Sequence, residues 1–229
     1  MGAAISLREC VSLSGRFPLL AGLSLEVREG EVVHLRGPNG AGKSSLLRLC
    51  AGLVPVVSGS AVVLGHDLRT DRHSVRREVG LLGHSGFLYD DLSVERNVQF
   101  AVRAARADPG QVEGALRRLG LDGRLRHVPV ARLSAGQRRR VSLAVLVARR
   151  PRLWLLDEPH AGLDQDGRAE LDQLVVEARA AGSTVVLASH ELERASAVSD
   201  RVVGLAGGRV VAASLCEGRV AGEVGSDVA

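Results

Sequence analysis

A single lysine, Lys43, lies in the segment GPNGAGKS at residues 37–44, whereas the other 29 of the 30 basic residues are arginines. The spacing matches G-x-x-x-x-G-K-[ST], in which backbone N–H groups form a nest for phosphate oxygens and the ammonium reaches the terminal phosphates. A planar guanidinium is too wide to replace that ammonium in the same cage. The segment therefore predicts a phosphate-binding loop. The residues expected to bind phosphate are Gly37, Pro38, Asn39, Gly40, Ala41, Gly42, Lys43, Ser44 and Ser45.

Two adjacent carboxylates, Asp157 and Glu158, follow the apolar run at residues 153–156. Open α/β sheets place ligand-binding residues at the carboxyl ends of their strands. A carboxylate at such a position holds Mg²⁺, usually through water, while the Ser44 hydroxyl ligates the ion directly. Glu158 is placed to polarise a water for attack on a terminal phosphate. Alone, an Asp-Glu pair could simply begin a loop, but together with the phosphate loop it predicts a hydrolytic site.

A third motif, LSAGQ at residues 133–137, begins a segment of helical pattern. A serine hydroxyl, free N–H groups and the positive end of a helix dipole make a good anion site. An ordinary helix cap is the alternative, with Ser134 capping and Gln137 completing a capping box. That alternative explains the residue types, but not their place shortly before a strand that ends in Asp-Glu.

With these motifs in order, the chain resembles the ATP-binding subunit of ABC transporters over nearly its whole length. The resemblance implies ATP and Mg²⁺ as cofactors. It also implies that LSAGQ is the signature motif, which closes through Ser134, Gly136 and Gln137 on the γ-phosphate of ATP held by the other protomer.

The same resemblance assigns three further residues. Asp164, in the string AGLD, resembles the loop at the dimer seam, and His190 resembles the histidine that contacts the γ-phosphate. Phe17 resembles the aromatic residue that stacks on adenine. However, its separation from Gly37 is slightly short, and a core phenylalanine is an equal alternative.

The chain departs from the family at His84, in the string LGHSG, where the family usually has a glutamine that senses Mg²⁺. We expect His84 to take over that role in catalysis, with a neutral loop replacement as the alternative. The strings LGH, LSAGQRRR and PRLWLLDEP together resemble the haem-exporter ATPase of cytochrome c maturation.

The elements that must position these residues form an α/β pattern. The pattern at residues 31–36 and the apolar runs at 79–82, 153–156 and 184–188 predict buried strands. Strand patterns at 5–13 and 23–27 predict an antiparallel element before the phosphate loop. Helical patterns fill residues 93–121, 133–149 and 168–181. We therefore expect one domain over residues 1–229, with the α/β P-loop NTPase core of the ABC ATPase type. An N-terminal antiparallel β subdomain and a helical subdomain inserted at roughly residues 86–145 complete it.

Composition narrows the functional class. The net charge is +4, but arginines alternate with acids and aromatics are only 2% of the chain, which disfavours a nucleic-acid partner. Three cysteines without metal-ligand spacing fit a reducing compartment. Neither a signal peptide nor a run of ~20 apolar residues is present in the sequence.

We therefore expect an ATPase that powers export through a separate integral membrane permease, as a peripheral protein on the cytoplasmic face of the inner membrane. Two copies, or one copy and a paralogue, would sandwich two ATP molecules. Haem or a cytochrome c maturation factor is the expected cargo, and another lipid, drug or peptide exporter is the alternative. A soluble non-transport ABC ATPase and a P-loop kinase are the remaining rivals. The soluble relatives usually need tandem domains, and a kinase does not explain LSAGQ.

Overall fold

The computed structural model describes residues 2–83 and 87–216 of the chain. Its centre is a six-stranded sheet in the order β10-β9-β3-β8-β7-β6, in which β10 is antiparallel and the other five strands are parallel. These strands are β3 (Val32–Arg36), β6 (Val79–Leu82), β7 (Leu153–Asp157), β8 (Thr184–Ala188), β9 (Arg201–Ala206) and β10 (Arg209–Leu215).

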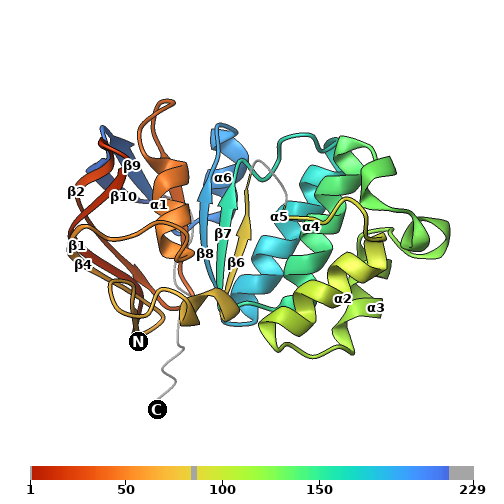
Figure 1. The fold of residues 1–229 in the computed structure, drawn as a ribbon. Helices are drawn as coiled ribbons and strands as arrows, with labels where there is room; N and C mark the ends of the chain where they lie inside the picture. Colours follow the sequence, from red (N-terminus) through yellow and green to blue (C-terminus); the bar gives the residue numbers. More distant parts are fainter. Residues whose placement is uncertain (1, 84–86, 217–229) are drawn as a thin grey trace, which may run out of the picture.

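A second, antiparallel sheet packs beside the first in the order β2-β1-β4-β5. It comprises β1 (Ala3–Ser14), β2 (Phe17–Arg28), β4 (Ser58–Val63) and β5 (His66–Asp67). Helix α1 (Lys43–Cys50) lies between the two sheets (Figure 1). The remaining helices lie on the opposite face of the central sheet and beyond its β6 edge. They are α2 (Val94–Ala105), α3 (Gln111–Arg118), α4 (Ala135–Arg149), α5 (Gln165–Ala180) and α6 (Leu192–Val198), with short 3₁₀ turns at Ser74–Arg77, Gly123–His127 and Val130–Arg132.

Alternating residues of the central strands build two hydrophobic cores. In β7, Leu153 and Leu155 join the core that contains α1 and the antiparallel sheet, whereas Trp154 and Leu156 join the core of the helical side. Every residue of β7 and β8 is buried. Parallel sheets covered on both faces have this character, because side chains alternate between faces and both faces lack water.

The topology places three strand ends side by side. β3 pairs with β8 and β8 pairs with β7, so Leu35 and Asp157 both lie opposite Ala188 at the carboxyl ends of the strands. The phosphate loop leaves β3 there, the Asp-Glu pair leaves β7, and residues 189–191 leave β8. The carboxyl ends of the strands are where ligands bind in open α/β folds.

The sequence predictions of fold class and of the main elements are confirmed, with differences at several boundaries. Both N-terminal strands are longer than expected, because register shifts in β1 carry the pairing past residues that interrupt the apolar alternation. Helix α5 begins at Gln165 rather than at residue 168, since Asp164 caps it. No expectation covered α6 or β5, which are short.

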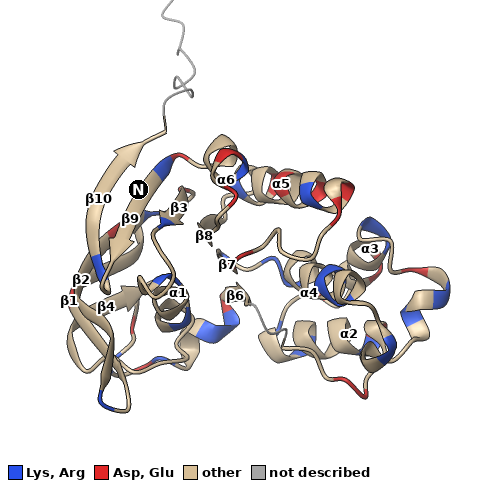
Figure 2. Cartoon of the chain, turned by 90° about the horizontal axis from the view of Figure 1, so that it is seen from above, with Lys and Arg blue, Asp and Glu red and all other residues tan. Residues whose placement is uncertain are grey.

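Within the described residues, no helix combines the length and apolar character needed to cross a bilayer. Basic and acidic residues are interspersed on α5 and α6 (Figure 2), as on a solvated helix surface.

Candidate active site

The phosphate loop connects β3 to α1, and its glycines adopt conformations that other residues rarely reach. Gly37 has φ 157° and Gly42 has φ 104°. A Cβ on Gly37 would lie 2.3 Å from the Leu205 carbonyl oxygen, and one on Gly42 would lie 3.2 Å from the Leu19 carbonyl oxygen. The tight backbone leaves the N–H groups of the loop and of the first turn of α1 available for anions.

Lys43 is the first residue of α1 and is only 8% exposed. Its ammonium donates to the carbonyl oxygens of Gly37 at 2.7 Å and Pro38 at 3.2 Å. The side chain therefore folds back over the loop that it serves, where a phosphate group would meet it. Ser44 and Ser45 follow in the first turn of α1, each partly exposed.

Asp157 ends β7 and is 7% exposed, and Glu158 follows it with a left-handed backbone at φ 45°. The N–H of Glu158 donates to the Ala188 carbonyl at 2.8 Å, which ties this residue to the end of β8. Positive φ is costly for a residue with a Cβ and persists where surrounding contacts hold it. The chain uses the turn to project the Glu158 side chain toward the loop after β8.

His190 contacts that carboxylate and also contacts Asn39 of the phosphate loop. The His190 N–H donates to Glu158 Oε2 at 3.2 Å, and His190 Nε2 lies 3.5 Å from Glu158 Oε1 and 3.1 Å from Asn39 Oδ1. Both neighbours of Nε2 are acceptors, so we place the ring proton on that nitrogen. The structure thus brings together the predicted residues of the phosphate loop, of β7 and of the loop after β8.

The LSAGQ motif lies at the start of α4, where Leu133 is buried and Ser134 is exposed. Ser134 Oγ accepts from the Gln137 N–H at 3.2 Å, and Gln137 Oε1 accepts from the Ser134 N–H at 3.0 Å. The capping box given as the alternative therefore exists, and a capping serine at an exposed helix start is equally suited to an anion. A Cβ on Gly136 would lie 3.3 Å from the Gly162 carbonyl oxygen, so this motif adjoins the AGLD string.

Asp164 caps α5 by accepting from the Gly167 N–H at 2.8 Å, and Arg140 of α4 lies 3.4 Å from its other oxygen. Two predicted segments, LSAGQ and AGLD, are therefore joined to each other on the helical side of the sheet. In Figure 1 that side is separated from α1 and the phosphate loop by the central strands.

Phe17 is the first residue of β2 and is 78% exposed, so the core alternative is wrong. Its strand approaches the phosphate loop, because the Leu19 carbonyl lies next to Gly42. Its role in stacking on adenine stays a prediction. His84 lies outside the described residues, and its role also stays a prediction.

Two histidines and one arginine near the site were not assigned a function from sequence. His160 is 3% exposed and shares a hydrogen bond of 2.8 Å with Asp172 of α5. His34 is fully buried in β3, where its Nε2–H donates to the Ser189 carbonyl at 3.2 Å, and burial lowers its pKa below the usual value. Arg139 of α4 lies within hydrogen-bond distance of the Glu158 carbonyl. An arginine in the run RRR carries no signal for that position in a chain with so many arginines.

Comparisons with known proteins show the family of this chain. A family model described as "ABC transporter" matches residues 20–161. The cytochrome c biogenesis ATP-binding export protein CcmA of Bordetella bronchiseptica is 41% identical over 191 residues, which are 82% of this chain and 84% of that protein. The ATP-binding cassette sub-family A member 7 of Mus musculus is 37% identical over 208 residues, which are 87% of this chain but only 9% of that much longer relative.

Two solved structures are similar in fold. One, the ATP-binding subunit of an ABC transporter, has a TM-score of 0.86 at 27% identity and covers 93% of this chain and 90% of its own. Another, a dimeric bacterial ABC transporter cassette, has a TM-score of 0.85 at 24% identity over 94% of this chain, a likeness of fold alone. The chain belongs to the ABC transporter family and has the fold of its ATPase domain.

Proposed function

We propose that this chain hydrolyses ATP at the carboxyl ends of β3, β7 and β8 and so powers an exporter. The observation that supports this most directly is the position of Glu158, whose carboxylate is held by His190 while His190 contacts Asn39 of the phosphate loop. A general base must be oriented toward the group whose proton it takes. Here the orienting residue is itself joined to the phosphate loop.

The residues present fit MgATP. The glycine-lined nest and the Lys43 ammonium suit the phosphates, with Phe17 exposed nearby for the adenine ring. The Ser44 hydroxyl and the Asp157 carboxylate supply the oxygen donors that Mg²⁺ prefers. When bound, the ion would neutralise charge on the β- and γ-phosphates. Glu158 would accept a proton from the attacking water as its oxygen bonds to the γ-phosphorus and the bond to ADP breaks.

A second copy of the chain, or a paralogue, would complete each site. Ser134, Gly136 and Gln137 lie at an exposed helix N-terminus on the side away from the phosphate loop of the same chain. A head-to-tail dimer would bring this helix start, and Asp164 beside it, to ATP held by the partner. The helices at roughly residues 86–145 would then move as one subdomain.

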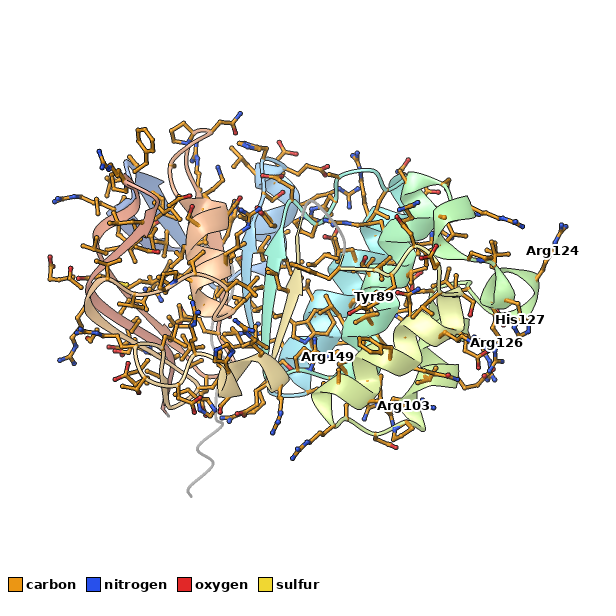
Figure 3. The ribbon with its side chains drawn as sticks, viewed as in Figure 1. Tyr89, Arg103, Arg124, Arg126, His127 and Arg149 are labelled. Atoms are coloured by element: carbon orange, nitrogen blue, oxygen red, sulfur yellow. The ribbon has the colours of Figure 1, made fainter. Side chains whose placement is uncertain are left out.

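A groove between β6 and α2 is suited to the membrane subunit. It encloses about 300 Å³ and is largely apolar, and four of its large side chains are strongly exposed: Leu53, Phe87, Tyr89 and Phe100. Tyr89 and Phe100 pack edge to face with ring centroids 4.9 Å apart (Figure 3 labels Tyr89). Exposed aromatic residues that gather around one groove mark an interaction site. We assign it to a cytoplasmic segment of the permease, which would hold this chain on the inner face of the membrane.

Haem or a cytochrome c maturation factor is the exported cargo that we favour. It is supported by the similarity to CcmA proteins along most of both chains. Lipid export is the second candidate, because a matched human relative is named phospholipid-transporting ATPase ABCA7, although the match covers only 10% of that relative.

Deletion of the gene tests the cargo. We expect loss of covalently bound haem from c-type cytochromes, restored by the native gene and not by a Glu158→Gln allele. Normal cytochromes with an altered lipid distribution would instead support the second candidate.

Co-purification tests the groove. Phe100→Asp should release the chain from its membrane subunit, whereas Val211→Asp, at an exposed apolar residue on β10, should not. Retention of the Phe100→Asp chain on the complex would remove the groove from the proposal.

A further inference from the structure

The guanidinium of Arg139 reaches the ends of two neighbouring strands from one position on α4. It donates to the carbonyl oxygens of Glu158 at 2.6 Å, Asp157 at 3.3 Å and Pro159 at 3.2 Å after β7. It also donates at 2.8 Å to the carbonyl of Gly83, which follows β6. No carboxylate pairs with it among the described residues, so its contacts are all to backbone.

Burial of the Arg139 guanidinium costs desolvation free energy. Desolvation lowers the pKa of Arg139, and the nearby Asp157 and Glu158 carboxylates oppose that effect. Arginine nevertheless stays charged in proteins, so the chain keeps a partly buried cation directly behind its two active-site carboxylates. A planar fork with several donors in fixed directions can reach carbonyls on two strands at once, whereas a lysine ammonium is a compact point charge with a shorter reach between its donors.

The contacts bear on the backbone of Glu158 itself. That residue has φ 45°, and it is held from one side by the Ala188 carbonyl at its N–H and from the other by Arg139 at its own carbonyl. A left-handed conformation at a non-glycine residue persists where the surroundings over-determine it. Without the Arg139 fork, the Glu158 backbone would keep its bond to β8 and a longer bond of 3.2 Å from the Ala161 N–H to its carbonyl. His190 would still contact the carboxylate, but the strongest contact to the Glu158 carbonyl would be lost.

We propose that Arg139 is a positioning residue for hydrolysis, which sets the backbone of Glu158 from helix α4. Because α4 also begins with LSAGQ, this residue couples the position of the exposed helix start to the geometry of the general base. The inference rests on the proposed role of Glu158. Arg139 would act through Glu158 and not through its own contact with nucleotide or water.

Arg149 provides a matched control on the same helix. Its guanidinium also has a pKa lowered by burial and also donates to carbonyls, those of Arg76 at 3.0 Å, Arg77 at 3.4 Å and Val79 at 3.0 Å. These lie at the amino end of β6, about 15 Å along the helix from Arg139. Figure 3 labels Arg149 at that end of the sheet. Loss of either fork should loosen α4 from β6, but only loss of the Arg139 fork should free Glu158.

The test compares Arg139→Gln, Arg139→Lys and Arg149→Gln with the native chain, together with its membrane subunit where the two purify together. We expect both Arg139 variants to lose kcat by ~10- to 100-fold, as small displacements of a catalytic group do, with KM and the Kd for ATP nearly unchanged. Arg149→Gln should keep kcat even though its Tm falls comparably. In a Glu158→Gln background, Arg139→Gln should cause no further loss, because the residue acts through Glu158.

Native kcat in the Arg139 variants would overturn the inference, as would equal kcat losses for Arg139→Gln and Arg149→Gln. An undiminished effect of Arg139→Gln in the Glu158→Gln background would also overturn it. Arg139→Lys keeps the charge and most of the side-chain volume, so its kcat tests the inference if Arg139→Gln does not fold. Absence of ATPase activity from the native chain, or native activity of Glu158→Gln, would instead contradict the proposed function.

Discussion

At the scale of single residues, Lys43 has both the placement and the isolation needed for a chemical test. An amine-directed acylating reagent has two kinds of target in this chain, the N-terminal amine and Lys43. With MgATP bound, the ammonium should contact phosphate oxygens and its acylation should slow sharply, while labelling of the N-terminal amine serves as the control. Mass spectrometry of the labelled peptides checks this, and equal Lys43 labelling with and without MgATP would count against the phosphate loop.

Charge alone should not suffice at position 43. Lys43→Arg should abolish hydrolysis, because the guanidinium fork does not fit where the ammonium donates to Gly37 and Pro38. Steady-state phosphate release measures this, and near-normal turnover of the variant would contradict the fit argument.

Glu158→Gln keeps the size of the side chain and removes its basicity. We expect hydrolysis to fall by roughly 10²–10⁴-fold with ATP binding intact, since one positioned general base is lost. Phosphate release and binding of a fluorescent ATP analogue separate the two effects. Rapid turnover in this variant would take the general-base role from Glu158.

The residues of this site differ in how far sequence could locate them. Lys43, Asp157 and Glu158 belong to motifs whose chemistry restricts the residue type, so their pattern predicts their place. The contacts of His190 with Asn39, and those of Arg139 with Glu158, join segments far apart in the chain. Such pairs depend on how β3, β8 and α4 are packed, which no local pattern records.

At the scale of elements, two helices begin with a capping serine, Ser93 at α2 and Ser134 at α4. Comparing them separates the capping interpretation of LSAGQ from the anion-binding interpretation. Ser134 at α4 and Ser93 at α2 share the same backbone angles, φ −64° and ψ 162°, and each side chain accepts from the third N–H of its helix. Replacement of either by alanine should lower the free energy of unfolding by about 1 kcal/mol. Only Ser134→Ala should also slow hydrolysis, and equal ATPase activity of both variants would leave Ser134 as a cap.

Strand β3 should make stability depend on pH through His34. Burial lowers the pKa of this imidazole, so below the ordinary value near ~6.5 the unfolded chain binds a proton that the folded chain resists. Stability should therefore fall as pH drops from about 6.5 toward the lowered pKa of the folded state. Urea unfolding of the native chain and of His34→Gln checks this, since glutamine keeps a donor for the Ser189 carbonyl without titrating. Identical pH dependence for both chains would remove His34 as the cause.

Elements with a long periodic pattern or an unbroken apolar run were predictable from sequence, whereas the short α6 and β5 were not. Helix α4 combines a capping box with fifteen residues of pattern, whereas α6 has seven residues and β5 has two. Over so few residues, local propensity is weak and tertiary packing decides the conformation. The path of the β8–α6 connection, which holds His190 against Glu158, follows from that packing.

At the scale of the whole molecule, the chain separates its two sets of nucleotide-binding residues. The phosphate loop, Glu158 and His190 lie at the carboxyl ends of β3, β7 and β8, while LSAGQ and Asp164 lie together on the helical side of the sheet. Glu158→Gln with ATP should therefore accumulate as a dimer, because unhydrolysed ATP would contact both chains there and so bind the associated state more tightly. Light scattering after gel filtration measures this, and a monomer at saturating ATP would oppose a shared site.

The most direct test of a site shared between two copies mixes two inactive variants. Lys43→Arg disables one half of each site and Ser134→Arg disables the other, so each variant alone should hydrolyse almost no ATP. In a mixed head-to-tail dimer, one site regains an intact Lys43 and an intact Ser134, from different chains. With mixed dimers confirmed by differently tagged chains, we expect an equal mixture to recover about a quarter of native ATPase activity per chain, because half of the dimers carry one working site of two. Mixed dimers that remain inactive, or a Ser134→Arg chain that hydrolyses ATP normally by itself, would contradict the account.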